Sequence, residues 1–215
     1  MPRWLAAIAA LSLATAAQAA PFQNGSFDVG APATFVFDIP AGSTQIPGWT
    51  VSVGTVDWIT NNWVSSQGTS SLDLVGSFAV GGVAQTFDTV PGTTYVVAFD
   101  LAGNPGGPPA VKPLAVTVNG VTSNFTFDTT GRSGAAMGWT RHSLTFTAAG
   151  TSSTIAFVSD VTGTGTNAGA ALDNVTITAQ GAAAPAAEIP LPWAHVGAAL
   201  LVLLGAAGLA RRGRR

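Results

Sequence analysis

The chain has 215 residues, of which 47% are hydrophobic and only 8% are charged, and its formal net charge is −2. It contains no cysteine, so disulfide frameworks, thiolate nucleophiles and cysteine-ligated zinc are excluded. Residues 20–188 hold nine Asp and one Glu against Lys112, Arg132 and Arg141. An acidic region without a basic stripe repels phosphate backbones, so no nucleic acid partner is expected.

The N-terminal segment has the three parts of a secretory signal peptide. Arg3 precedes an apolar run from Trp4 to about Ala14, and Ala17-Gln18-Ala19 forms a small-x-small cleavage site. The alternative is a buried N-terminal helix, although such a helix would show polar positions at intervals. We assign residues 1–19 to a signal peptide and expect export, with the mature chain beginning near Ala20.

Residues 20–179 are predicted to form one all-β domain, a β-sandwich. Short runs rich in Val, Thr and aromatic residues alternate with Gly, Pro, Asn and Ser, and no segment before Pro190 keeps the 3.6-residue period of an amphipathic helix. The predicted strands are 50–59, 71–75, 83–87, 95–101, 114–118, 124–127, 139–146, 154–159 and 171–178.

The stretch 83–104 is predicted to lie at the centre of this domain. Tyr95, Val97 and Phe99 share one parity, as expected of a half-buried strand. Pro91-Gly92 separates this strand from the preceding apolar run and favours a tight reversal. We therefore expect a β-hairpin here, followed by an exposed loop at the Gly- and Pro-rich segment 103–113.

The C-terminal region reads as a linker and a membrane-spanning tail. Residues 180–188 are mostly small and contain no core-forming side chains, which favours a flexible linker. In the segment 189–215, an apolar run of 18 residues from Trp193 to Ala210 is followed by four arginines. At about 1.5 Å per residue, a helix of this length is roughly 27 Å long and just spans a bilayer, with the arginines remaining in the cytoplasm.

This tail resembles the PEP-CTERM-like sorting signals of Gram-negative bacteria, in the variant with a V-P-L-P-A motif. Ile189-Pro190-Leu191-Pro192-Trp193 occupies the motif, with Ile in place of Val and Trp in place of Ala. The resemblance implies transient anchoring in the inner membrane, cleavage by an exosortase-type protease, and transfer to the cell surface or extracellular matrix. An ordinary C-terminal membrane anchor is the alternative.

The domain resembles the choice-of-anchor C family, which is related to the domain-of-unknown-function 642 family and to galactose-binding-like jelly rolls. The matching segments, in chain order, are NGSFD, IPGW, VDWI, QGTSSLDL, the stretch 83–104, GW and LDNV. The resemblance implies an extracellular jelly-roll β-sandwich with the character of a carbohydrate-binding module.

A calcium site is expected at three polar residues. In related jelly rolls, the acidic residue of an N-G-x-F-E motif and the Asp of a late D-N-V motif help to bind a structural calcium ion; here the resemblance places Asp28 and Asp173 at these positions. Asp173 also shares parity with Val175 and Ile177, so it is expected to face the core, where a carboxylate needs a cation or several hydrogen bonds. Asn24 is a candidate further ligand, and hydrogen bonding of Asp173 to nearby backbone amides is the alternative.

Glycan binding is expected to use tryptophan, because aromatic faces stack on sugar rings. Trp63 lies in a polar loop and is the first candidate for an exposed stacking residue, followed by Trp58, whereas Trp49 and Trp139 are expected to be core residues. Packing of Trp63 in the core or at its rim is the alternative.

Catalysis has little support, because His142, the only histidine of the domain, is expected to point inward and the aspartates are scattered. We therefore expect a secreted, non-catalytic protein that binds polysaccharide, such as the exopolysaccharide of its own matrix. A structural matrix protein without glycan binding is the first alternative. A carbohydrate-active hydrolase with two carboxylates across a cleft is the second.

Overall fold

The computed structural model describes residues 20–180, apart from positions 78 and 165. The signal peptide predicted at 1–19, nearly all of the linker and the sorting signal at 189–215 lie outside the described residues. No helix in the described part of the chain is long and apolar enough to span a membrane.

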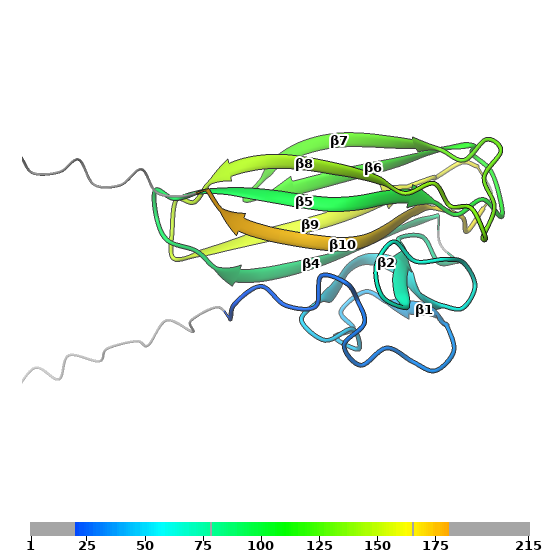
Figure 1. Ribbon diagram of the computed structural model, residues 1–215, viewed down its shortest axis with the longest axis horizontal. Helices are drawn as coiled ribbons and strands as arrows, with labels where there is room; N and C mark the ends of the chain where they lie inside the picture. Colours follow the sequence, from blue (N-terminus) through cyan, green and yellow to red (C-terminus); the bar gives the residue numbers. More distant parts are fainter. Residues whose placement is uncertain (1–19, 78, 165, 181–215) are drawn as a thin grey trace, which may run out of the picture. The chain divides into compact units, whose positions relative to one another are not determined.

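The described residues form ten strands, arranged as a sandwich of two antiparallel sheets with no helix (Figure 1). Sheet A has the order β2-β4-β9-β6-β7, and sheet B has the order β1-β2-β3-β10-β5-β8. The all-β fold is as predicted. The strands are β1 (Val36–Pro40), β2 (Thr50–Thr60), β3 (Ser70–Asp73), β4 (Val80–Asp88), β5 (Thr94–Gly103), β6 (Val111–Val118), β7 (Val121–Asp128), β8 (Thr140–Thr147), β9 (Ser152–Asp160) and β10 (Ala170–Ala179).

Strand β2 belongs to both sheets, and Gly54 marks where it changes from one to the other. Residues 50–54 pair with β4 in sheet A, whereas residues 55–60 pair with β1 and β3 in sheet B. Gly54 has a φ of 57°, and a Cβ there would lie 1.8 Å from the carbonyl oxygen of Val80. Only glycine therefore allows the strand to turn this corner in contact with β4.

All nine predicted strands are present, within a few residues of the expected bounds, but β1 was not predicted. Its inward residues, Val36 and Ile39, lie opposite Trp58 and Val56, and the register shifts between them. Asp38, in this bulge, has a φ of 56°. The bulge breaks the alternation by which a strand is recognised in a sequence.

The predicted hairpin in the stretch 83–104 is wrong. Strands β4 and β5 lie in opposite sheets, where β4 pairs with β2 and β9, and β5 pairs with β10 and β8. The tight turn at Pro91-Gly92 instead carries the chain from one layer to the other, and Gly92 donates a hydrogen bond to the carbonyl of Ala148. Each strand needs an apolar face toward the core, and this requirement is met equally well across the sandwich as within one sheet.

The expected exposed loop at 103–113 is shorter than predicted, because β6 begins at Val111. Lys112 is fully buried, and its ammonium donates hydrogen bonds to the carbonyl oxygens of Gly107 (2.6 Å) and Ala168 (2.8 Å). Burial lowers the pKa of Lys112, and the nearby Asp73 opposes this effect. Lys112 therefore links the loop that contains Gly107 to the segment that contains Ala168, although an exposed loop was expected here.

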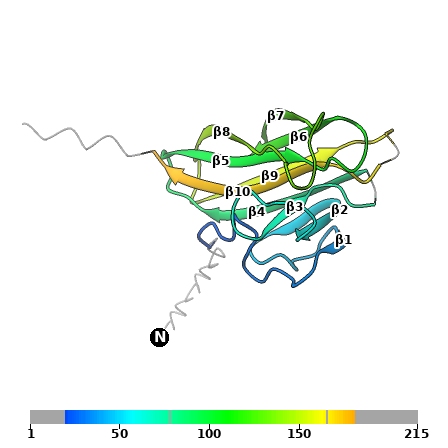
Figure 2. The same ribbon diagram turned by 45° about the vertical axis from the view of Figure 1, so that its right-hand side comes forward.

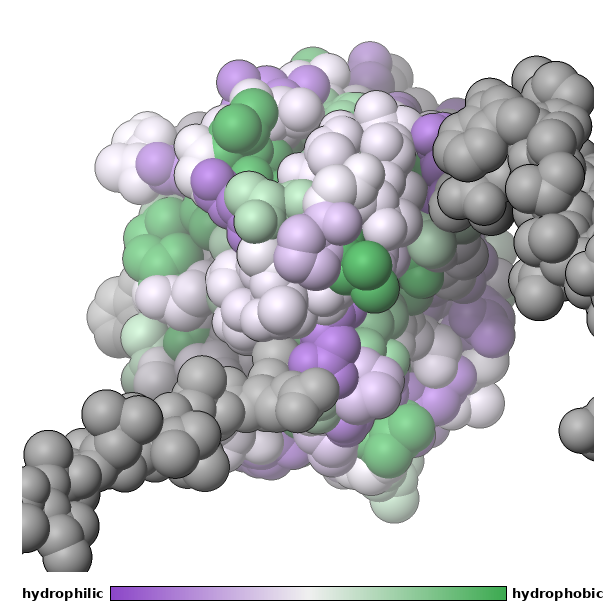
Figure 3. Space-filling model, turned by 90° about the vertical axis from the view of Figure 1, so that its left-hand side faces the viewer, coloured by the Kyte–Doolittle hydropathy of each residue, from purple (hydrophilic) through white to green (hydrophobic). Residues whose placement is uncertain are grey.

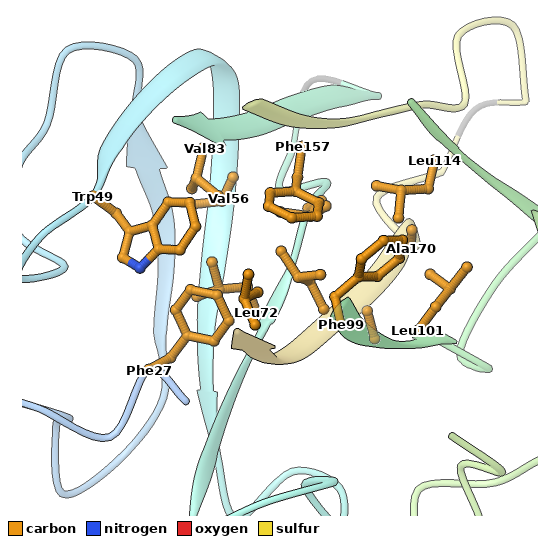
Figure 4. Close-up of a cluster of buried hydrophobic side chains, with 14 of the residues drawn as sticks. Phe27, Trp49, Val56, Leu72, Val83, Phe99, Leu101, Leu114, Phe157 and Ala170 are labelled. Carbon is orange, nitrogen blue, oxygen red and sulfur yellow. The ribbon is translucent and has the colours of Figure 1, made fainter. Parts of the chain in front are cut away.

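A single core fills the space between the sheets (Figure 4). Phe27, Trp49, Phe157 and Phe99 follow one another across it, and the ring centroids of successive residues are 5.3–6.1 Å apart. Such tilted and edge-on contacts are the preferred arrangements of aromatic rings. Trp49 is 2% exposed, as expected for a core residue.

Candidate functional site

Trp63 and Trp58 are both buried, which contradicts the prediction that they are exposed for stacking. Trp63 is 7% exposed and its indole N–H donates to the hydroxyl of Ser71 at 2.7 Å, while Trp58 is 1% exposed and donates to the carbonyl of Phe27 at 3.0 Å. The polar neighbours of Trp63 in the sequence were misleading, because the loop folds back and turns the ring inward. Neither ring has a free face for a sugar.

The aromatic rings that do reach the surface lie elsewhere. Trp139 is half-buried and donates its indole N–H to the carbonyl of Val64 at 2.9 Å. Phe35 (43% exposed) and Phe37 (51% exposed) stack on each other at the start of β1, with their ring centroids 4.4 Å apart. Trp139 is therefore less buried than the core position expected for it.

Asp28 and Asp173 both accept hydrogen bonds from one loop, residues 66–70. Asp28 accepts hydrogen bonds from the backbone N–H groups of Thr69 (2.9 Å) and Ser70 (3.0 Å). Asp173 accepts one from the N–H of Gln67 (2.9 Å). The first segment of the domain also lies beside β10, where Val175 N–H donates to the carbonyl of Gly25. The two carboxylates thus hold the loop from either side.

Asp173 does not face the core, contrary to the parity argument. It lies opposite Asp100 on β5, and directly opposite residues point to the same side of a sheet. The register shifts after Asp173, where Asn174 has a φ of 49°, so Val175 points inward although it is two residues away. Asp173 is nevertheless fully buried, because the loop covers it. Burial, together with the Asp28 charge, raises the pKa of Asp173 to about 7, although backbone N–H donors oppose the shift.

The residues present fit a calcium ion in part. Two carboxylates share the loop, and a Cβ on Gly68 would lie 1.9 Å from Asp28 Oδ2, so the backbone closely approaches that oxygen. Asn24, by contrast, uses its side chain within the fold: its amide donates to Pro47 O at 2.9 Å, and its Oδ1 accepts from Val29 N. No group of three or more His, Cys, Asp or Glu residues suited to a metal occurs among the described residues. Backbone carbonyls and water would have to complete the six to eight oxygens that calcium requires.

Further carboxylates on this side of sheet B are also used by the fold. Asp57 and Asp73 lie opposite each other, and burial raises the pKa of Asp57 to about 6 and that of Asp73 to about 7. Asp73 accepts from the N–H groups of Val75 and Gly169 and from the Asn104 amide. These carboxyl groups are covered and hydrogen-bonded, so they are not available to a ligand.

The Asp100 carboxylate is bonded to three side chains. It forms the one salt bridge among the described residues, with Arg141 at 3.0 Å, and accepts from the hydroxyl of Ser66 and the amide of Asn174. Burial acts to raise the pKa of Asp100, but these hydrogen bonds outweigh it and lower the pKa. Arg141 also donates to the carbonyl of Asn174 and the hydroxyl of Thr176. The polar groups of this cluster are therefore engaged with one another.

A groove of about 400 Å³ on the outer face of sheet A contains polar side chains that are not engaged in this way. It crosses β9, β6 and β7, and its lining includes Pro113, Ala115, Val158, Asn124, Thr126 and Asp160. The first three supply a flat apolar floor. In the described part of the chain, the side chains of Asn124 and Thr126 form no hydrogen bond with the protein.

Asp160 lies at the end of β9 and supplies the charge of the groove. Its Oδ1 accepts from the N–H of Thr162 at 2.8 Å, and hydrogen bonds from Thr162 lower the pKa of Asp160, so the carboxylate is ionised at neutral pH. Hydrolysis of a glycoside by paired carboxylates needs a second acid across the cleft, and the lining described here contains only Asp160.

His142 points inward, as predicted. Its ring stacks on Phe99 with centroids 5.8 Å apart, and its Nε2 is 2.9 Å from the hydroxyl of Thr140. The groove residues were not predicted. Thr122, Asn124 and Thr126 occupy alternate positions along β7, as the solvent-facing residues of any half-buried strand do. Pro113, which was expected to lie in an exposed loop, lies inside β6 instead.

The position and order of these segments agree with a known family. The family described as "Protein of unknown function (DUF642)" matches residues 20–178, which covers the domain from its first bridged residue to the last strand. The chain belongs to the DUF642 family. No curated protein matches it.

Solved structures similar to this DUF642 domain include two modules described as carbohydrate-binding. One is a family 61 module, TmCBM61, in complex with β-1,4-galactotriose, with 14% identity, a TM-score of 0.44, and coverage of 74% of this chain and 97% of that chain. Another is the CBM22-1 xylan-binding domain from Paenibacillus barcinonensis Xyn10C, with 20% identity, a TM-score of 0.44, and coverage of 68% and 94%.

The arabinose-bound α-L-arabinofuranosidase MgGH51 is also similar, with 15% identity and a TM-score of 0.49. The match covers 75% of the DUF642 chain but 26% of that enzyme, so the domain corresponds to about a quarter of the enzyme's length.

Proposed function

We propose that this protein is a non-catalytic polysaccharide-binding protein, and that the groove on the outer face of sheet A holds the glycan. The observation that carries the proposal is the pair of uncommitted polar side chains, Asn124 and Thr126, beside an apolar floor. Ligand sites join apolar surface with a few placed polar groups. A groove of about 400 Å³ suits a short stretch of sugar chain rather than a large partner.

The polar groups match the chemistry of sugar hydroxyls. The Asn124 amide can both donate and accept. The ionised Asp160 can accept hydrogen bonds from two adjacent hydroxyl groups of a sugar. Strand β7 is the edge of sheet A, so its outer backbone groups are also free of strand partners. Pro113 and Val158 supply the apolar surface against which the C–H face of a pyranose can pack.

The charge of the domain favours a neutral glycan. Residues 20–180 hold nine Asp against Lys112, Arg132 and Arg141. Of these three, Lys112 is buried and Arg141 is paired with Asp100. A uronate-rich polymer would meet Asp160 without a compensating cation in the groove lining, which costs binding free energy.

The test is a glycan-array screen of the chain beginning at Ala20, followed by affinity electrophoresis on the polysaccharides that bind. Asn124→Ala and Asp160→Asn should each weaken binding by about tenfold, which corresponds to the loss of one hydrogen bond to a sugar hydroxyl. Thr86→Val, on the same outer face but outside the groove lining, is the matched control and should bind normally. Undiminished binding by both groove variants would show that the glycan binds elsewhere.

A structural matrix protein remains the second candidate, because Phe35 and Phe37 form an exposed apolar pair on an edge strand. Exposed aromatic residues of this kind favour contact with another protein. If no glycan binds in the screen while Phe35→Ser with Phe37→Ser prevents incorporation of the protein into the matrix, this candidate is the better one.

We also propose the cellular route and the metal. The signal peptide and the sorting signal predict export and transfer to the surface of a Gram-negative cell, with membership of the choice-of-anchor C group. Intact-mass measurement on protein recovered from the native surface should show a chain beginning near Ala20 that lacks the apolar run 193–210. A retained run would identify the tail as a plain membrane anchor. A structural calcium ion at Asp28 and Asp173 would stabilise the loop 66–70 that both carboxylates hold.

A further inference from the structure

The N-terminal end of the described chain is already part of a sheet. Ala20 forms a parallel bridge with Phe87 of β4, and its carbonyl accepts a hydrogen bond from the N–H of Asp88 at 2.9 Å. Two residues later, Phe22 packs edge-on against both Phe87 and Trp49, with centroids 5.7 Å apart in each case. Figures 1 and 2 both show the start of the described chain beside the end of β4. Ala20 is thus fixed next to Asp88.

Asp88 has a carboxylate oxygen without a partner. Its Oδ1 is buried and accepts no hydrogen bond from the described residues, and the other two such side-chain atoms are the hydroxyl oxygens of Thr60 and Ser70. A hydroxyl without a partner is tolerated more easily than a carboxylate oxygen, because the desolvation of a charged group costs more. The Asp88 side chain as a whole is half-buried, and among the described residues its Oδ1 is the one buried carboxylate oxygen without a hydrogen-bond donor.

We propose that cleavage between Ala19 and Ala20 supplies this donor, so that the new α-ammonium group of Ala20 forms an ion pair with Asp88. Hydrolysis of this peptide bond consumes one water molecule, leaves a carboxylate on Ala19 of the released peptide, and leaves an amine on Ala20 that takes up a proton. An amide nitrogen with one proton and no charge becomes an ammonium with three donors and a positive charge. The proposal rests on the cleavage site that the sequence predicts after Ala19.

The backbone contact fixes which residue carries the new charge. The carbonyl of Ala20 accepts a hydrogen bond from the N–H of Asp88, and Ala20 is bridged to Phe87, the neighbour of Asp88 in the chain. The proposal places the ammonium of Ala20 against the carboxylate of Asp88. In Figure 3, which faces this end of the sandwich, the visible hydrophobic residues are separated by pale and hydrophilic ones.

The consequence is that processing completes the fold. Before cleavage, Ala20 can pair with β4 only through its backbone, and Asp88 keeps its unpartnered oxygen. After cleavage, the same contact includes an ion pair, and the first segment of the domain is held more firmly against β4.

The test compares two forms of the chain beginning at Ala20, purified in the same detergent: one with a free α-amine and one acetylated at Ala20. Acetylation removes the charge but keeps the chain length. The free form should melt a few degrees higher, as is typical for one partly buried ion pair in a domain of this size. In Asp88→Asn the difference should vanish, whereas in the exposed control Asp128→Asn it should persist.

Two outcomes overturn the proposal: equal melting temperatures of the two wild-type forms, or an undiminished difference in Asp88→Asn. If Asp88→Asn does not fold, the wild-type comparison still decides, and reaction of the Ala20 amine with a succinimidyl ester provides a second measurement. Labelling should be slower in the folded wild-type chain than in the urea-unfolded chain, after correction for the intrinsic rate of a short peptide with the same N-terminal residues. Equal corrected rates would show a free amine and would also overturn the proposal.

Discussion

The outer faces of the two sheets use their polar groups in opposite ways. On sheet B, carboxylates from β2, β3, β10 and β5 are covered by loops, and each accepts hydrogen bonds from the protein. On sheet A, the groove across β9, β6 and β7 is open, and Asn124 and Thr126 keep their hydrogen-bonding capacity free. The outer face of sheet B therefore carries more carboxylates than that of sheet A, but fewer of its polar groups are available to a ligand. Spare hydrogen-bonding capacity, rather than the density of acidic residues, distinguishes the proposed binding surface from the outer face of sheet B.

The largest expected effect tests whether the buried rings of Trp58 and Trp63 stabilise the fold. Trp58→Ala should destabilise the domain by about 3–5 kcal/mol, because a fully buried ring leaves a cavity. Trp63→Ala should also destabilise it, with the added loss of the hydrogen bond to Ser71. Urea unfolding measures both. If Trp63→Ala instead abolished glycan binding at unchanged stability, the comparison between the two faces would be reversed.

The next effect concerns the covered carboxyl groups of sheet B. The folded state raises the pKa of Asp57 to about 6, and those of Asp73 and Asp173 to about 7, above the ordinary value of 3.8. Groups with raised pKa values stabilise the fold fully below pH 3.8, and this contribution is lost as the pH rises toward 7. The free energy of unfolding should therefore fall between pH 4 and pH 7.

Stability is also expected to fall at low pH, and a matched variant tests the decline above pH 4. Hydrogen bonds from Ser77 lower the pKa of Asp38, so its contribution is lost as the pH falls below 3.8, and maximal stability is expected near pH 4. Asp57→Asn keeps an acceptor for the N–H of Asp38 and should make the decline above pH 4 shallower. Asp128→Asn, an exposed control, should leave the decline unchanged. A flat profile from pH 4 to 7 in the wild type would mean that these carboxyl groups are not covered in solution.

A smaller effect is expected from calcium. If an ion binds Asp28 and Asp173, it stabilises the folded state by mass action, so calcium should raise the melting temperature at pH 7 by a few degrees and chelation should lower it. Asp173→Asn should abolish the response while the fold remains. An absence of any response in the wild type would show that the two carboxylates hold the loop 66–70 without a metal.

The smallest effect is expected in the groove. Asn124→Ala should change the free energy of unfolding by no more than about 0.5 kcal/mol, because its side chain is exposed and bonds to nothing in the described structure. Chemical denaturation of this variant is the control for its glycan-binding defect. A loss of several kcal/mol would place Asn124 among the structural residues and would weaken the contrast with sheet B.

Much of the fold could be predicted from the sequence, because strand formation depends on local alternation. Short runs rich in Val, Thr and aromatic residues identified nine strands, and the absence of a helical period predicted that helices are scarce. The partners of each strand could not be predicted, since Pro91-Gly92 suits a reversal within one sheet and a connection between sheets equally well. The strand β1 was hidden by the bulge at Asp38.

The candidate site was predicted less well, because it depends on what covers each side chain. The placement of Asp28 and Asp173 at one site followed from the resemblance, and both carboxylates accept hydrogen bonds from the loop 66–70. The prediction that Asp173 faces the core was wrong, because the positive φ of Asn174 interrupts the alternation of inward and outward residues along β10. The burial of Trp63 depends on a loop of polar residues whose path no local pattern reveals.

Both ends of the domain leave at the same end of the sandwich (Figure 1). Ala20 is bridged to Phe87 at the end of β4, and Gln180 N–H donates to the carbonyl of Thr94 at the start of β5, so the two ends leave from different sheets. Asp160, which lines the groove, pairs with Val80 at the other end of β4. A fusion partner attached at either end of this DUF642 domain would therefore leave the groove on sheet A accessible.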